Sequence, residues 1–225
     1  LCDTNGGTLP VEVARIIADY VTAEFRAERT LDAVSISPND GGDACECEEC
    51  RVTDREAGAE DVTAAEDFDY LEDSDDESDR PHAITDRLFR MANRVARIVG
   101  RRFPDRLLLT HLYGRYRTPP VAHDLDPRVI GQYCVMGCGF HNALLEKREL
   151  DRLSGFAGRV SRLGIYEYYS NGAWPEIHRV FPDLVESTVR SYYQYGARYF
   201  QTQASHGFAC NGINLYVLGR MLWDT

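Results

Sequence analysis

The sequence predicts an α/β fold, namely the C-terminal part of a (β/α)8 TIM-type barrel with about six βα units. Two observations support this fold class. Short, nearly continuous apolar segments alternate with longer segments whose apolar residues recur every three or four positions. Such an alternation is typical of a parallel sheet that is covered by helices. The apolar strands are too numerous for a small αβ sandwich, and they fit the later strands of a barrel.

The first elements are predicted from apolar periodicity. The chain opens without Met on Leu1-Cys2, which reads like the end of a strand, so we expect a piece of a longer protein. A helix is expected at 11–29, with Pro10 at its start and its apolar residues on one face. The segment LDAVSIS, residues 31–37, then predicts a short strand.

After an acidic segment, the same alternation continues to the C-terminus. The clearest helix is expected at 84–98, where Ile84, Leu88, Met91, Val95 and Ile98 form an apolar stripe. Strands are predicted at 106–113, 128–136, 164–170 and 197–203, and helices at 150–160, 184–192 and 213–223. We therefore expect a single barrel domain over residues 1–225. A doubly wound open sheet is the competing topology, but the sequence has no Gly-rich loop of the kinds that bind nucleotides.

The net charge of −11 comes from one segment of the chain. Residues 40–80 hold 18 of the 36 acidic residues and only three arginines, whereas bases slightly outnumber acids elsewhere. A segment this acidic buries too little apolar surface to offset the entropy that it loses on ordering. We therefore expect a mobile acidic loop insertion at about 51–80. A tail that binds a basic partner is the less favoured interpretation.

The sequence excludes several classes of function. It contains no stripe of lysine and arginine residues, so we do not expect a nucleic-acid partner. No apolar run is long enough to span a bilayer. The N-terminal segment also lacks the basic and apolar regions of a secretory signal.

The expected site lies where the strands end. In a parallel barrel, the loops that follow the strands gather on one face and build the active site. The carboxyl groups in these loops belong to Asp3, Asp40 and Glu167. These three residues are therefore the first candidates for acid–base chemistry.

Several phrases of the sequence resemble one known family. They are LCDTN, SISPNDG followed by C-x-C-x-x-C, TDRLFRMANRVA, PDRLLLTHLYGRYRTPP, YCVMGC with a later HN, GIYEYYSNGAWP and INLYVLGRMLWD. In this order they resemble a domain-of-unknown-function family related to the α-glucuronidases and other barrel glycoside hydrolases. The resemblance covers nearly the whole chain apart from the acidic segment. It implies a catalytic barrel that acts on carbohydrate.

Glycosidic cleavage needs two carboxyl groups, one to protonate the leaving oxygen and one to act as base or nucleophile. We predict Asp40 and Glu167 for these roles. Asp40 follows the fourth strand of the barrel, but Pro-Asn-Asp-Gly is equally typical of a simple turn. Glu167 lies in the apolar segment IYEYY, where desolvation would raise its pKa towards general-acid use. The alternative for Glu167 is a buried barrel residue that is paired with an arginine.

Further residues at the strand ends are predicted to bind sugar. Aromatic faces pack on sugar rings, and amide or imidazole groups form hydrogen bonds with hydroxyl groups. The predicted set is Asn39, His111, Tyr113, His141, Tyr168, Trp174 and Gln203. Tyr166 and Tyr168 share one face of their strand and Glu167 lies on the other, so only one of these sets can face the barrel lumen. Gln201 and Gln203 stand where the resembled family often carries an acid, which weakens the hydrolase interpretation.

Cys45, Cys47 and Cys50 have the spacing C-x-C-x-x-C, which has two interpretations. Three thiolates can share one structural zinc ion, and a closed site needs a fourth ligand. That ligand would come from a neighbouring loop: Cys134, Cys138 or His141. The alternative is a disulfide, for example between Cys47 or Cys50 and Cys138. Catalysis itself is expected to need no cofactor, so the metal would be a structural zinc.

Two functions of different class follow from these observations. The first is a glycoside hydrolase that uses Asp40 and Glu167 as its two carboxyl groups. The second is a non-catalytic carbohydrate-binding barrel that has lost its acid pair. Carboxyl groups roughly 5 to 10 Å apart would favour hydrolysis, and carboxyl groups on opposite faces would favour binding. The expected partner is a carbohydrate in both cases. A zinc ribbon is disfavoured because a second C-x-x-C pair is missing.

Overall fold

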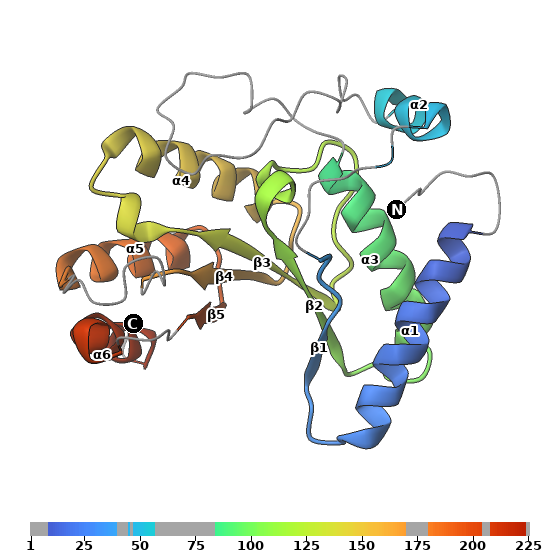
Figure 1. The fold of residues 1–225 in the computed structure, drawn as a ribbon, viewed down its shortest axis with the longest axis horizontal. Helices are drawn as coiled ribbons and strands as arrows, with labels where there is room; N and C mark the ends of the chain where they lie inside the picture. Colours follow the sequence, from blue (N-terminus) through green and yellow to red (C-terminus); the bar gives the residue numbers. More distant parts are fainter. Residues whose placement is uncertain are drawn as a thin grey trace.

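The computed structural model of the chain describes residues 9–39, 45, 47–56, 84–169, 180–203 and 208–223. Within these residues, five strands form one sheet in which every neighbouring pair is parallel (Figure 1). The strands are β1 (Ala33–Ser35), β2 (Leu107–Leu112), β3 (Val129–Val135), β4 (Leu163–Glu167) and β5 (Tyr199–Thr202). The predicted strand remnant at the N-terminus lies outside the described residues.

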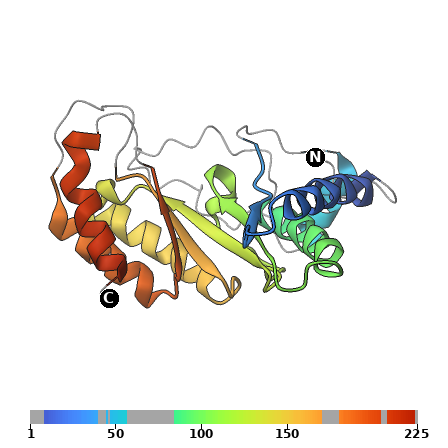
Figure 2. The same cartoon turned by 90° about the horizontal axis from the view of Figure 1, so that it is seen from below.

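The strands lie in the sheet in the same order as in the sequence, from β1 to β5. A doubly wound sheet reverses its strand order at one point, and the five described strands show no such reversal. The sheet is therefore singly wound. It curls into a half-barrel, which is compatible with part of a TIM-type barrel (Figure 2).

Helices alternate with the strands. They are α1 (Leu9–Ala27), α3 (Ile84–Gly100), α4 (Ala143–Ala157), α5 (Pro182–Gln194) and α6 (Phe208–Trp223). Figures 1 and 2 show α1 and α3 side by side near β1 and β2, and α5 and α6 side by side near the other end of the sheet. None of the described helices is long and apolar enough to cross a membrane.

Side chains alternate between the two faces of the sheet. The residues that face the helices include Leu108, Leu112, Tyr133 and Ile165, all of which are buried in the main core. The residues between them point to the opposite face, which we call the inner face. On the inner face His111 of β2 is in register with Gln132 of β3, and Gln132 is in register with Gly164 of β4.

Aromatic side chains extend the core from α3 to α4. The Phe89 ring of α3 lies 6.5 Å from the Phe156 ring of α4, and the Phe156 ring lies 5.7 Å from that of Tyr133 on β3. All three side chains are fully buried. Both helices are therefore fixed against the helix-facing side of β3.

The connection from β2 to β3 contains a short 3-10 helix, η3 (Gly114–Arg117), and no α-helix. The buried Asp86 of α3 holds this connection, because its carboxylate accepts hydrogen bonds from three successive backbone N–H groups. The donors are Val121, at 2.8 Å, Ala122, at 3.0 Å, and His123, at 2.7 Å. The hydrogen bonds to this one carboxylate thus hold the connection in place, where a βα unit would have an α-helix.

Replacing Asp86 by alanine is expected to lower the free energy of unfolding by roughly 1 to 2 kcal/mol, because three half-buried N–H groups lose their acceptor. Urea unfolding followed by circular dichroism would measure this loss. Asp151→Ala, at an exposed position of α4, is the control. Equal stability of the two variants would contradict the bracing role of Asp86.

The structure changes two predicted boundaries. Helix α4 begins at Ala143, seven residues before the predicted 150–160 stripe, because the Asn142 side chain caps it by accepting from the N–H groups of Leu144 and Leu145. Strand β4 ends at Glu167, three residues short of the predicted 164–170. Directly after this end, the N–H of Tyr168 donates a hydrogen bond to the side-chain carboxylate of Glu167.

The expected acidic loop at 51–80 is wrong at its start. Residues 51–56 belong to helix α2 (Glu48–Glu56), which the sequence did not predict. The physical reason is an ion pair between Asp54 of α2 and Arg87 of α3, which holds the helix in place. The rest of the acidic segment lies outside the described residues.

Candidate functional site

The carboxyl ends of the strands lie along one edge of the sheet, because all of them are parallel. Ser37, just beyond β1, connects the first two of these ends, since its Oγ accepts a hydrogen bond of 2.9 Å from the N–H of His111. Asn39 follows and is exposed. Asp40 lies outside the described residues. The start of the predicted Pro-Asn-Asp-Gly turn is therefore anchored beside the end of β2.

Three rings form a row on the inner face near this edge. The rings of His111 and Tyr166 meet edge to face, with their centroids 5.1 Å apart. The ring of Tyr168 lies 5.0 Å from that of Tyr166. All three side chains are half-buried, so each has surface that solvent can reach. We call His111, Tyr166 and Tyr168 the aromatic row.

A buried amide lies on the inner face next to the strand position of His111. Gln132 of β3 is only 3% exposed, and its Oε1 has no hydrogen-bond partner in the part of the chain that the structure describes. A Cβ atom on Gly164 would lie 3.1 Å from the Gln132 Cγ and 3.0 Å from the Tyr199 Cβ. Because residue 164 is glycine, the side chains of Gln132 and Tyr199 can pack closely against the backbone of β4.

Glu167 lies at the end of β4 but on the opposite face from Tyr166. Its side chain is completely buried, and its carboxylate accepts three hydrogen bonds. Oε1 accepts from the N–H groups of Gly137, at 2.7 Å, and Tyr168, at 2.8 Å, while Oε2 accepts from the Tyr192 hydroxyl of α5, at 2.6 Å. A Cβ at position 137 would lie 2.7 Å from Oε2, so a side chain there would force the Glu167 carboxyl group to shift.

Burial raises the pKa of Glu167 from 4.5 to about 7, although its three hydrogen bonds act in the opposite direction. Among the described residues no arginine pairs with Glu167, so within them the predicted alternative of a carboxylate paired with an arginine is not found. Both oxygens are used to join β4 to α5 and to the 3-10 helix η4 (Gly137–Gly139). In this arrangement the carboxyl group has no surface on the inner face.

The other predicted sugar-binding residues are spread along the same edge. Tyr113, directly after β2, is 36% exposed. His141 is exposed in the turn that leads to α4. Gln203 follows β5, is half-buried, and donates its backbone N–H to the carbonyl oxygen of Glu167 at 3.3 Å. Trp174 lies outside the described residues. Of the predicted set, only His111 and Tyr168 belong to the aromatic row.

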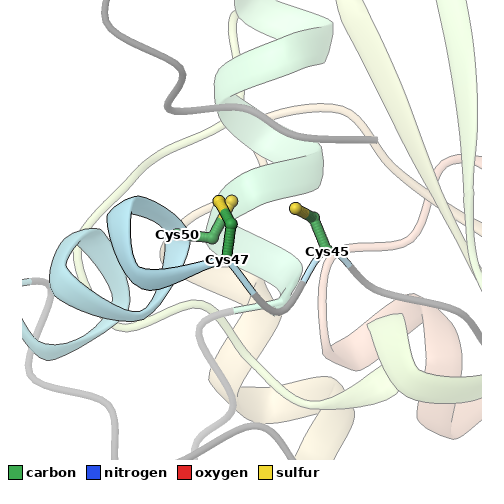
Figure 3. Close-up of side chains that lie close together, drawn as sticks. All are labelled: Cys45, Cys47 and Cys50. Atoms are coloured by element: carbon green, nitrogen blue, oxygen red, sulfur yellow. The ribbon is translucent and has the colours of Figure 1, made fainter.

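The sulfur atoms of Cys45, Cys47 and Cys50 lie within 4.8 Å of one another. Figure 3 shows these sulfurs together at the start of α2, beside α3. None of the three is in a disulfide. Among the described residues, neither Cys134 nor His141 belongs to this group, and the side chain of Cys138 is not described. We call Cys45, Cys47 and Cys50 the cysteine trio; it has the ligand chemistry of a zinc site.

One buried ionic cluster was not predicted from the sequence. Glu149 of α4 pairs with Arg117 of η3 and with Arg152, and it accepts a hydrogen bond of 2.6 Å from the Tyr133 hydroxyl. Burial raises the pKa of Glu149, but the two arginines and Tyr133 outweigh this effect, and the pKa is lowered. Helical spacing could have suggested the Glu149–Arg152 pair. Nothing local in the sequence points to Arg117.

Tyr166 and Gln132 are two inner-face residues that the predicted sugar-binding set lacks. A signal for both was present, because residues two apart on a strand share a face and neighbouring strands pair in register. The register that brings Gln132 beside His111 could not be read from the sequence.

A comparison with protein-family models finds one match over residues 1–225, to the family described as Domain of unknown function (DUF4838). No curated protein and no solved structure matches the chain.

Proposed function

The chain belongs to the DUF4838 family, and on this premise we propose that the inner face of its half-barrel binds carbohydrate. The relation of this family to the α-glucuronidases, and the completion of the sheet to a (β/α)8 barrel, are parts of the same proposal. The observation that carries it is the aromatic row, with the buried Gln132 in register beside His111.

The aromatic row has the chemistry that sugars require. A sugar ring presents patches of C–H groups, which pack on aromatic faces, and hydroxyl groups, which need hydrogen-bond partners at their rims. Tyr166 and Tyr168 offer both a ring face and a hydroxyl, and His111 offers ring nitrogens. Barrels place such groups at the carboxyl ends of their strands, where the row lies.

Tyr166→Ala is expected to weaken oligosaccharide binding by about tenfold, which corresponds to about 1.4 kcal/mol. The ring of Tyr166 is central to the row, so its removal takes away the contacts with both neighbours. Calorimetric titration with neutral and uronic-acid oligosaccharides would measure the change. Tyr20→Ala, at an exposed position of α1, is the matched control. Equal affinities of the two variants would show that the aromatic row is not part of the binding site. If the unmodified protein binds no oligosaccharide, the proposal is wrong.

Glycoside hydrolysis by Asp40 and Glu167 is the second candidate function. The raised pKa of Glu167, about 7, favours it, because a general acid works best when its pKa is near the working pH. The burial of both Glu167 oxygens opposes direct contact with a sugar on the inner face. Turnover of aryl-glycosides by Asp40→Asn and Glu167→Gln separates the two functions. A loss of orders of magnitude in both variants would favour hydrolysis by this pair.

For the cysteine trio we propose a structural zinc ion. Three sulfurs that lie within 4.8 Å of one another support this proposal. The ion would supply a fixed crosslink between the segment that follows β1 and the start of α2.

A further inference from the structure

Helix α2 lacks the apolar face that holds most short helices in place. Among the side chains of α2 that the structure describes, those of Cys50 and Asp54 are buried, whereas Val52 is 38% exposed. A helix of this length is unstable alone, because isolated helices shorter than about 12 residues are marginal in water. What fixes α2 must therefore be sought at Cys50 and Asp54.

These two side chains lie on one face of α2, because they are four positions apart in the helix. Asp54 pairs with Arg87 of α3 through two hydrogen bonds, one of them 2.9 Å long from Nε to Oδ1. Arg87 uses a third N–H group, on Nη1, to donate to the carbonyl oxygen of Cys45 at 2.8 Å. One guanidinium thus binds the chain at Cys45 and at Asp54, on either side of Cys47 and Cys50.

The cysteine trio supplies the second anchor. Zinc–sulfur bonds of about 2.3 Å in tetrahedral geometry place sulfurs about 3.8 Å apart, and those of the trio already lie within 4.8 Å. Cys50 is completely buried, so a metal bound there would draw α2 against the rest of the protein. Three thiolates and one divalent cation carry a net charge of −1, which the nearby Arg87 offsets.

We propose that α2 is a metal-dependent element: a thiophilic divalent cation held by Cys45, Cys47 and Cys50 folds α2 onto α3, and Arg87 is the residue that positions both ends of the site. This rests on the structural zinc proposed above. Each thiol that binds the cation releases its proton to solvent, and no oxidation or reduction takes place. Because the unfolded segment holds no preformed site, the free energy of metal binding becomes free energy of folding for α2.

Cobalt titration of the full chain, prepared with a chelator, tests metal binding. One equivalent of Co²⁺ should give sulfur-to-cobalt charge-transfer absorption, and Zn²⁺ should abolish it by displacement. Cys50→Ser should weaken or remove this absorption. The matched control is Cys134→Ser, which changes a buried cysteine of β3 outside the trio and should leave the absorption unchanged. If the unmodified chain binds no Co²⁺, the zinc proposal and the present inference both fail.

Hydrogen exchange tests the coupling to folding separately. Amides of residues 48–56 should exchange slowly with Zn²⁺ bound and rapidly after its removal, while amides of α3 remain protected in both states. If Co²⁺ binds but the protection of α2 is the same with and without metal, the coupling is wrong and the zinc site stands. Asp54→Asn should reduce the protection of α2 without changing the cobalt spectrum.

Arg87→Lys tests the positioning role of the guanidinium. Lysine keeps the charge but cannot donate to Asp54 and to the Cys45 carbonyl at the same time. Loss of such an outer-sphere partner is expected to weaken metal affinity by about 10- to 100-fold. The position of the cobalt bands should not move, because the three ligands are unchanged. Arg97→Lys, at an exposed position of the same helix, is the control. An unchanged affinity in Arg87→Lys would overturn the role of Arg87.

Discussion

Replacing Glu149 by alanine is expected to lower the free energy of unfolding by about 3 to 5 kcal/mol. The side chains of Arg117, Glu149 and Arg152 are all less than 10% exposed, so their charges have little contact with water. Removal of the carboxylate takes an ion-pair partner from both guanidinium groups, and it takes away the acceptor of the Tyr133 hydroxyl. The cost of uncompensated buried charge makes this loss much larger than the net worth of the ion pairs themselves.

The control for Glu149 lies on the same helix. Asp151 forms an i,i+4 pair with Lys147, and both side chains are more than 60% exposed. Asp151→Ala is therefore expected to change stability by at most about 0.5 kcal/mol. Urea unfolding at neutral pH compares the variants with the unmodified protein. A loss below about 1 kcal/mol in Glu149→Ala would mean that water enters the cluster and that its charges are not buried in solution.

The second large effect is a pH dependence that originates at Glu167. Its pKa is about 7 in the folded protein, against 4.5 for an ordinary glutamate, so the folded state holds the proton more tightly than the unfolded chain does. The unfolding free energy therefore falls as pH rises from about 4.5 to about 7, and it levels off above that range. The shift corresponds to roughly 3 kcal/mol between the two ends of this range.

Glu167→Gln isolates this contribution, because glutamine stays neutral over the whole range. Its amide oxygen can still accept from the Gly137 and Tyr168 N–H groups, and its NH₂ group can donate to the Tyr192 hydroxyl. Urea unfolding of both proteins between pH 4 and 8 would measure the difference. The unmodified protein should lose roughly 3 kcal/mol relative to the variant as pH rises. The exposed Glu12→Gln is the control, and parallel curves for all three proteins would contradict the raised pKa.

The periodic parts of the fold could be predicted from the sequence. The apolar stripe at 84–98 corresponds to α3, and the five predicted strands correspond to β1 to β5, because burial on one or both sides leaves a local pattern. The winding of the sheet could not be obtained in this way, since strand order depends on contacts between distant segments. Helix α2 was missed for a similar reason, as it is held by Arg87, which lies more than thirty residues away in the sequence.

The candidate site was only partly accessible to sequence reasoning. Strand alternation placed Tyr166 and Glu167 on opposite faces, and the structure agrees. Which of the two faces is the inner one depends on where α5 packs, because the Tyr192 hydroxyl reaches Glu167 from that helix. The raised pKa of Glu167 could be predicted, because it follows from the apolar residues around it in the sequence. The positions of the Gly137 N–H donor and of the Gln132 amide depend on loop geometry and strand register, so they could not be predicted from the sequence.

The register of β1 has a consequence for the order in which the sheet assembles. Leu108 of β2 pairs with Val129 of β3 across a short connection, whereas Ala33 of β1 pairs with Leu107 although residues 36–106 separate the two strands. Loop-closure entropy delays contacts between distant segments, so strands β2 to β5 are expected to associate before β1 joins them. Strand β1 has only three residues, so few ladder hydrogen bonds hold it to β2. The anchor between Ser37 and His111 is then among the last contacts to form and among the first to open.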